Sequence, residues 1–203
     1  MQLGFKFKND KPEILIKEDG DVLYYKNFFN LEESETFLNK LYKETDWKEE
    51  EIKMFGNKVK IPRLTAWYGD PNSNYAYSGI KMNPNPWTDT LKEIKKRIED
   101  KSKISFNSVL LNLYRDGNDS ISWHSDNEPE LGKEPIIGSV SFGEVRKFHL
   151  KHKTKNIETI RIDLDNGSFL LMKGKTQQYW KHQIPKTTKK LNHRINLTFR
   201  VIQ

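Results

Sequence analysis

The 203-residue sequence contains no cysteine. A disulfide framework, a zinc site built from thiolates and a cysteine nucleophile are therefore all excluded. Long hydrophobic runs are missing too, because no stretch approaches the roughly 18 apolar residues of a membrane span. The first residues, Met1–Lys6, lack the apolar run of a signal peptide. From these absences we expect a soluble, intracellular protein with no membrane partner, located in the cytoplasm or, in a eukaryote, the nucleus.

Acidic residues are the minority charge. There are 28 Asp and Glu against 35 Lys and Arg, which gives a net charge of +7. A basic surplus favours a polyanionic partner such as nucleic acid, although many basic proteins bind none. The length suits one well-packed domain, so we expect residues 1–203 to form a single domain and the protein to be a monomer.

The first half of the chain predicts two amphipathic helices. Apolar residues recur at helical spacing between Leu31 and Tyr42, and Asn30 is placed to cap that helix. A second apolar stripe predicts a helix from about Trp87 to Asp100, with lysine and glutamate on its other face. Both helices are expected to pack one face against a core.

After residue 103 the pattern changes to period two, which predicts short strands. Clear examples are Val109–Tyr114, Ser139–Phe142 and Ser168–Met172, the last preceded by the tight-turn pair Asn166-Gly167. Residues 1–20 form either an extension or an added edge hairpin. Two helices followed by many strands indicate an α+β protein with an antiparallel sandwich or barrel.

A candidate metal site begins with His124-Ser125-Asp126. On a strand, the histidine and the aspartate would project from the same face. His182, in the strand-like segment Trp180–Ile184, is the best candidate for a third ligand. Two imidazoles and one carboxylate are the facial triad of non-haem iron(II) oxygenases. Taken alone, His-x-Asp also fits a polar surface strand, so the rest of the chain has to decide.

The segment Arg194–Arg200 alternates between apolar and polar residues. Its polar face is either a solvated outer face or a clamp for a dicarboxylate, because arginine pairs with carboxylates through two parallel hydrogen bonds. Asn112 and Tyr114 supply hydrogen-bonding groups from one face of an earlier strand. Asparagine is disfavoured within a strand of valine and leucine, which favours a functional role for Asn112.

In combination these residues resemble the AlkB family of oxidative demethylases. The matching elements, in the family's order, are Pro62–Gly69, Tyr75–Gly79, Asn112–Tyr114, Trp123–Glu128, Ser139–Gly143, His182 and Arg194–Arg200. The resemblance covers the chain from about residue 20 to its end. It implies a double-stranded β-helix, or jelly roll, over about residues 103–203, with flanking helices and an N-terminal nucleotide-recognition lid over about residues 45–82.

The resemblance also implies an iron(II) enzyme with 2-oxoglutarate and O2 as cosubstrates. The catalytic iron ligands would be His124, Asp126 and His182. Arg194 would hold the distal carboxylate of 2-oxoglutarate, and Arg200 would lie near its chelating end. The residues implied to complete that pocket are Asn112, Tyr114, Asn196 and Thr198. The implied reaction is DNA repair by demethylation of bases such as N1-methyladenine and N3-methylcytosine, with release of succinate and formaldehyde.

Around the flipped base the resemblance places Arg63, Tyr75, Tyr77, Ser78 and Glu128. Tyrosine faces attract a cationic ring, and the Glu128 carboxylate suits the exocyclic amine of the base. Ordinary core packing is the alternative for the two tyrosines, and an exposed loop charge is the alternative for Glu128.

Phe55 lies where family members carry a hairpin that faces DNA. There it would wedge between base pairs and fill the gap left by a flipped base, or it would simply pack the hairpin onto the domain. His149 and His152 lie in a basic strand, Lys147–Lys153, which either contacts phosphates or forms a solvated edge. His193 is assigned no role.

Three other functions stay open at this stage. One is demethylation of RNA, since branches of the family act on DNA and RNA alike. A protein hydroxylase on the same scaffold fits the base-pocket residues less well. A non-catalytic nucleic-acid-binding module would need a broken triad or a lost clamp, and neither is seen in the sequence. The partner is therefore alkylated DNA, with RNA as the alternative.

Overall fold

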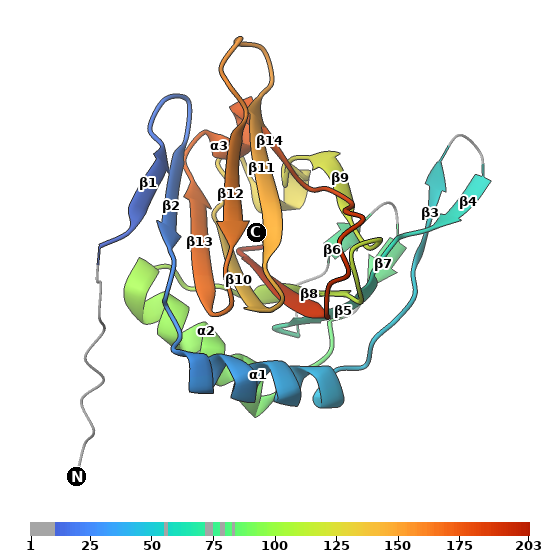
Figure 1. Ribbon diagram of the computed structural model, residues 1–203. Coiled ribbons are helices and arrows are strands. Elements are labelled where there is room, and N and C mark those ends of the chain that lie inside the picture. Colours follow the sequence, from blue (N-terminus) through green and yellow to red (C-terminus); the bar gives the residue numbers. More distant parts are fainter. Residues whose placement is uncertain (1–10, 55–56, 72–74, 78–79, 83) are drawn as a thin grey trace.

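A computed structural model describes residues 11–203 except 55–56, 72–74, 78–79 and 83, and of residues 52–54, 75–77 and 80–82 it describes the backbone. Two β-sheets face each other, and two helices cover the outer side of the larger sheet (Figure 1). All strand pairs within these sheets are antiparallel. The prediction of an α+β protein with an antiparallel sandwich is therefore confirmed.

The major sheet has seven strands and the minor sheet has four. In spatial order the major sheet contains β1 (Glu13–Ile16), β2 (Asp21–Tyr25), β13 (Ser168–Lys173), β10 (Ile137–Gly143), β15 (Arg194–Arg200), β8 (Ser108–Tyr114) and β5 (Leu64–Gly69). The minor sheet contains β12 (Ile160–Leu164), β11 (Arg146–His152), β14 (Trp180–Ile184) and β9 (Ile121–His124). The remaining small elements are the hairpin β3 (Glu51–Met54) with β4 (Asn57–Lys60), the hairpin β6 (Tyr75–Tyr77) with β7 (Ile80–Met82), the short helix α3 (Thr176–Tyr179) and the 3-10 turn Pro129–Leu131.

Both predicted long helices are present. The first ends two residues later than predicted, and the second begins and ends two residues later than predicted. Helix α1 (Leu31–Glu44) begins at a capping box, in which the side chain of Asn30 accepts from Glu33 N–H and the side chain of Glu33 accepts from Asn30 N–H, each at 2.9 Å. Helix α2 (Asp89–Ser102) begins after Thr88, whose hydroxyl accepts a backbone N–H. The caps thus explain where both helices start.

The helices pack on one face of the major sheet. Helix α1 contacts β10, β15 and α2. On β15 the side chains of Ile195, Leu197 and Phe199 are completely buried in this layer. Burial of each such side chain stabilises the fold by roughly 1.5–3 kcal/mol. Within the described residues, no helix is both long and apolar enough to cross a membrane.

One structural expectation needs correction. Strand β11 is no solvated edge, because it lies between β12 and β14. His152, at its end, is buried, with Nε2 3.2 Å from a carboxylate oxygen of Asp19. The expectation came from the many charges of this strand, but its alternate residues Phe148 and Leu150 face the interior.

The turn at Asn166-Gly167 is confirmed, with Gly167 at a φ of +75° that favours glycine. It joins β12 of the minor sheet to β13 of the major sheet, so the two strands do not form a hairpin. For residues 1–20, the described part shows the edge hairpin, since β1 pairs with β2 and continues to Tyr25.

Candidate active site

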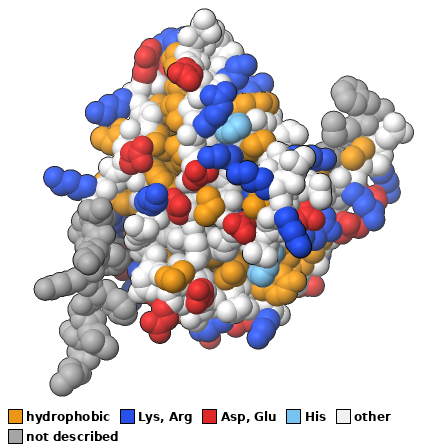
Figure 2. All heavy atoms as spheres, in the orientation of Figure 1, with side chains coloured by type: hydrophobic (Ala, Val, Ile, Leu, Met, Phe, Trp, Pro, Cys, Tyr) orange, Lys and Arg blue, Asp and Glu red, His pale blue; other side chains and the backbone are white. Residues whose placement is uncertain are grey.

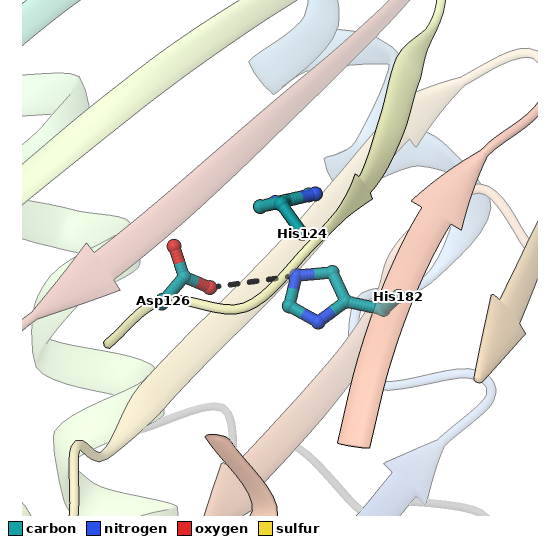
Figure 3. Close-up of side chains that lie close together, drawn as sticks. All are labelled: His124, Asp126 and His182. Carbon is teal, nitrogen blue, oxygen red and sulfur yellow. Dashed lines mark ion pairs between the residues drawn. The ribbon is translucent and has the colours of Figure 1, made fainter. Parts of the chain in front are cut away.

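Three side chains that suit a metal ion meet between the two sheets. His124 ends β9, Asp126 follows two residues later, and His182 lies in the middle of β14. One ligand atom from each lies within 4.8 Å of the others, and Figure 3 shows the three groups turned toward one another. The predicted triad is thus brought together in space.

A bulge in β9 makes this arrangement possible. His124 pairs with His182 and Ile121 pairs with Ile184, so three steps along β9 match two along β14. Both His124 and Ile121 therefore line the interior. The expectation that Asp126 extends the same strand is wrong, because β9 ends at His124.

After β9 ends at His124, two hydrogen bonds hold the next residues close to the metal-binding group. The backbone N–H of Asp126 donates to the side-chain oxygen of Gln177 at 3.0 Å. The hydroxyl of Ser125 donates to the carbonyl of Trp180 at 2.8 Å. These contacts place the Asp126 carboxylate, 3.5 Å from His182 Nε2, although it lies outside any strand.

The protonation states of His124 and Asp126 suit metal binding. His124 Nδ1 lies 2.8 Å from the carbonyl oxygen of Ser122, so Nδ1 donates and Nε2 is left for a metal. Burial, followed by the charge of His182, lowers the pKa of His124 to about 4, so its ring is neutral at pH 7.

Burial alone would raise the pKa of Asp126, but Arg200, whose Nη2 lies 2.5 Å away, and His182 hold it well below its usual value. Asp126 is therefore an anion at neutral pH. Neutral imidazole and ionised carboxylate are the forms that bind a divalent metal. The donor set fits iron(II).

A cavity of about 260 Å³ adjoins the triad and has a polar wall. On β15 and β8, Arg194 pairs directly with Tyr114 and Asn196 with Asn112. All six residues that the sequence analysis assigned to the 2-oxoglutarate pocket line this wall: Asn112, Tyr114, Arg194, Asn196, Thr198 and Arg200. The alternative of a solvated outer face for β15 is therefore wrong.

Arg194 is the wall's most unusual member. Its guanidinium is buried over the ring of Tyr114, 5.1 Å from the centroid, and Nη2 donates to Ser141 at 2.8 Å. Nε and Nη1 are buried without a hydrogen-bond partner in the described structure. Burial lowers the pKa of Arg194 to about 10, which leaves it cationic at pH 7. A buried cation with unused donors is costly unless an anion pairs with it, so Arg194 fits a carboxylate ligand.

Two of the residues expected around the base lie in the same cavity. Arg63 is buried, and it donates from Nε to Asn112 at 2.7 Å and from Nη1 to the Ser120 carbonyl at 3.2 Å. Glu128 also lines the cavity, and its Oε2 is buried without a partner among the described atoms. Glu128 is therefore more than an exposed loop charge.

The other expected base contacts cannot be placed. Tyr75 and Tyr77 lie on strand β6, whose side chains are outside the described structure. Phe55 and Ser78 lie outside the described residues altogether. Their roles stay predictions from the resemblance.

Sequence reasoning assigned no role to three residues that support the site. Ser139 accepts from Asn196, Ser141 accepts from Arg194, and Gln177 accepts from Asp126 N–H. The two serines alternate with buried Val140 and Phe142 in β10, a signal that could have indicated a polar inner face. Gln177 lies 51 residues from Asp126 in sequence, and no pattern singles it out.

The comparisons with known proteins agree with this geometry. The family model of the 2OG-Fe(II) oxygenase superfamily matches residues 21–200. The chain belongs to this superfamily. It is 42% identical over 190 residues to the mouse alpha-ketoglutarate-dependent dioxygenase alkB homolog 3, a match that covers 89% of the chain and 66% of that relative. It is 34% identical over 197 residues to the human DNA oxidative demethylase ALKBH2, covering 92% of the chain and 76% of that relative.

Among solved structures, that of OsALKBH1 superimposes with a TM-score of 0.62 at 18% identity, covering 88% of this chain and 97% of that chain. That likeness supports the jelly-roll fold. The AlkB-like membership, the fold class and the cofactor set of iron(II), 2-oxoglutarate and O2 are confirmed by these findings. The chain spans about two thirds of the length of the alkB homolog 3 relative, 66% of it.

Proposed function

We propose that this protein is an oxidative demethylase of alkylated bases in DNA, acting in DNA repair on lesions such as N1-methyladenine and N3-methylcytosine. In that reaction 2-oxoglutarate is decarboxylated to succinate, and the methyl group leaves as formaldehyde. One observation carries the proposal: a single cavity joins the His124–Asp126–His182 group to the buried guanidinium of Arg194 and to a buried carboxylate oxygen of Glu128. Among the described residues, two nitrogens of that guanidinium and that oxygen have no hydrogen-bond partner. Similarity to ALKBH2, named a DNA oxidative demethylase, supports it.

At the metal end, His124, Asp126 and His182 would hold iron(II). When bound, iron(II) supplies the oxidising chemistry, using O2 and 2-oxoglutarate. Arg200 keeps the Asp126 carboxylate ionised and oriented. The neutral His124 ring is held in one tautomer by the Ser122 carbonyl.

At the cosubstrate end, Arg194 would bind the distal carboxylate of 2-oxoglutarate through its unused N–H groups. Tyr114 and Ser141 keep the guanidinium in place. Asn112, Asn196 and Thr198 supply further polar groups along the same wall. Thr198 donates to Asn196 at 3.0 Å, so these side chains act as one network.

At the base end, Glu128 would accept from the exocyclic amine of the flipped base. An anionic acceptor favours the positively charged methylated rings over the neutral, unmethylated ones. Arg63 would contact the base while fixed by Asn112 and Ser120. Tyr75, Tyr77 and Ser78 would line the same pocket, and Phe55 would act as the wedge.

The lid proposed for about residues 45–82 contains the hairpins β3–β4 and β6–β7. In Figure 1 the strands of the β3–β4 hairpin project away from the two sheets. Such a hairpin can reach along a nucleic acid bound at the cavity. We assign it substrate recognition, within a single domain that works as a monomer.

The test is turnover of oligonucleotides that carry one N1-methyladenine or one N3-methylcytosine, as DNA and as RNA, each single- and double-stranded. With iron(II) and 2-oxoglutarate, we expect formaldehyde and succinate in equal amounts from the DNA substrates. Turnover confined to the RNA substrates would mean that the protein is an RNA demethylase and not a DNA repair enzyme. Succinate formation with no formaldehyde from any methylated oligonucleotide would contradict the proposal.

A further inference from the structure

The outer face of the minor sheet, which the cavity does not use, carries an aromatic row. His149 on β11 lies directly opposite Arg161 on β12 and Gln183 on β14. The Gln183 side-chain nitrogen is 3.2 Å from His149 Nδ1. The ring of Trp123 on β9 lies 6.3 Å from the His149 ring, and Trp123 is 37% exposed. We call Arg161, His149, Gln183 and Trp123 the outer row.

Uncompensated positive charge lies next to the outer row. Lys151 and Lys181 are direct cross-strand partners on β11 and β14, and both are exposed. Neither forms an ion pair within the described part of the chain. Like charges placed directly opposite each other destabilise a sheet. The pair therefore does not serve the fold, and a polyanion bound across it would remove the repulsion.

A hollow of about 560 Å³ continues this face beyond His149. It lies between β11 and residues 185–191. Its charged lining consists of Arg146, Lys147, Lys186 and Lys189 together with the acidic Glu144 and Asp163. Lys147 is paired with Asp163 at 2.8 Å, whereas Lys186 and Lys189 are exposed. Figure 2 shows basic side chains around a histidine with hydrophobic ones beside them on this side of the molecule.

We propose that the outer row, with Lys151, Lys181 and the hollow, binds the single-stranded DNA that flanks the base held in the cavity. This proposal rests on the proposed function and extends it to a surface outside the active site. Unpaired bases stack on aromatic rings while cations follow the phosphates, and the outer row offers both together. In a duplex the base faces are covered by their neighbours, so this surface selects a single strand.

The path between the cavity and the outer row is short. Strand β9 is an edge of the minor sheet. His124 faces the cavity, and Trp123, its neighbour in the chain, faces outward. Adjacent Cα atoms are about 3.8 Å apart. A DNA strand that passes over the edge at β9 therefore leaves one nucleotide in the cavity and brings the next ones onto Trp123 and His149.

The first experiment measures binding of a fluorescent, unmethylated single-stranded 15-nucleotide DNA by anisotropy at several salt concentrations. For Lys151→Ala/Arg161→Ala we expect an affinity loss of about tenfold at low salt, and a salt slope smaller by about 1.4, because two phosphate contacts are lost at about 0.7 each. The matched control, Lys40→Ala/Lys96→Ala, removes two exposed lysines from α1 and α2 and should change neither quantity. Equal slopes for the two double variants would overturn the proposal.

A stacking variant tests the aromatic part separately. His149→Ala should lower affinity for the single strand about fivefold or more with the salt slope unchanged, and it should leave affinity for a duplex of the same sequence unaltered. Equal losses on single strand and duplex would overturn the assignment to a single strand. Thermal unfolding of each variant is recorded first, and Lys151→Ala should not lower the melting temperature, since it relieves a like-charge pair.

Turnover separates this proposal from the proposed function. A methylated mononucleotide has no flanking nucleotide to place on the outer row, so Lys151→Ala/Arg161→Ala should demethylate it like the wild type and lose kcat/KM about tenfold on a methylated 15-mer. An equal loss of kcat/KM on both substrates would overturn the assignment of DNA binding to this surface. A wild type that binds the 15-mer with the expected salt slope but releases no formaldehyde would refute the demethylase and support the surface as a DNA-binding site.

Discussion

The same strands form both faces of the major sheet, but the side chains on the two faces differ in chemistry. Toward the helices, β15 presents Ile195, Leu197 and Phe199, all completely buried among apolar neighbours. Toward the minor sheet the same strand presents Arg194 and Asn196, which are buried as well. The two faces of β15 therefore do not differ in burial. They differ in the chemistry of the side chains that are buried.

The difference shows what each face of β15 contributes. Apolar burial stabilises the folded state in proportion to area, whereas a buried polar group costs free energy unless it is hydrogen-bonded. On the inner face, the side-chain nitrogen of Asn196 donates to Ser139 and Val140, but two guanidinium nitrogens of Arg194 have no partner in the described structure. On β15 the helix-facing side contributes apolar burial, and the inner side carries groups that suit a ligand. Neighbouring strands add apolar residues such as Leu170 and Met172 to the inner face, so that face supports the fold as well.

The largest expected effect is on the inner side, at the triad. His182→Ala removes one iron ligand, so formaldehyde release from a methylated oligonucleotide should fall by at least about 100-fold, and iron(II) affinity should fall with it. The melting temperature should change little, because the helix-facing core is untouched. His193→Ala, a histidine outside the cavity, is the matched control and should keep wild-type turnover. An iron-loaded His182→Ala protein with full activity would refute the ligand assignment.

On the helix-facing side the expected effect is on stability. Leu197→Ala should lower the free energy of unfolding by about 2–5 kcal/mol, because it leaves a cavity in a fully buried layer. The protein that stays folded should bind 2-oxoglutarate with wild-type affinity. Urea unfolding and cosubstrate titration together check this. A large loss of affinity for 2-oxoglutarate with little loss of stability would contradict this assignment, because the helix-facing residue would then support the cosubstrate site and not the fold.

A smaller effect is expected from pH. The pKa of His124 is about 4 in the folded, metal-free protein, below the ordinary value of 6.5. Its contribution to stability is therefore complete above about pH 6.5 and is lost as the pH falls from there toward 4, since the unfolded chain takes up the proton first. Urea unfolding of the metal-free protein between pH 7.5 and 4 should show this decline. In His124→Gln the decline should be shallower, and an identical slope would contradict the assignment.

Sequence patterns predicted the periodic parts of this architecture well. Strand β15 has its predicted bounds, and Asn30 caps α1 as expected, because alternation and capping are local properties. The bulge in β9 could not be predicted, since it depends on how β9 pairs with β14, which is distant in sequence. The same holds for the position of β11 between β12 and β14, which its charged residues concealed.

For the site, residue types and order indicated the triad and the arginine clamp, and the fold brought them to one cavity. The supporting contacts were out of reach of the sequence. Arg63 reaches Asn112 across 49 residues, and Gln177 reaches Asp126 across 51. Such pairings follow from the packing of the two sheets, and neither is marked by a local motif.

One measurement tests the central claim most directly: that the inner face holds its buried charge for a ligand. It is the stabilisation of the iron(II)-loaded protein by 2-oxoglutarate, without O2, in the wild type and in Arg194→Met. At 100 times its dissociation constant the cosubstrate should stabilise the wild type by about 2.7 kcal/mol. Arg194→Met should be at least as stable as the wild type without 2-oxoglutarate, because an uncompensated buried charge is gone, and should gain nothing at the same concentration. A methionine variant that is less stable alone and is still stabilised fully by 2-oxoglutarate would contradict the account.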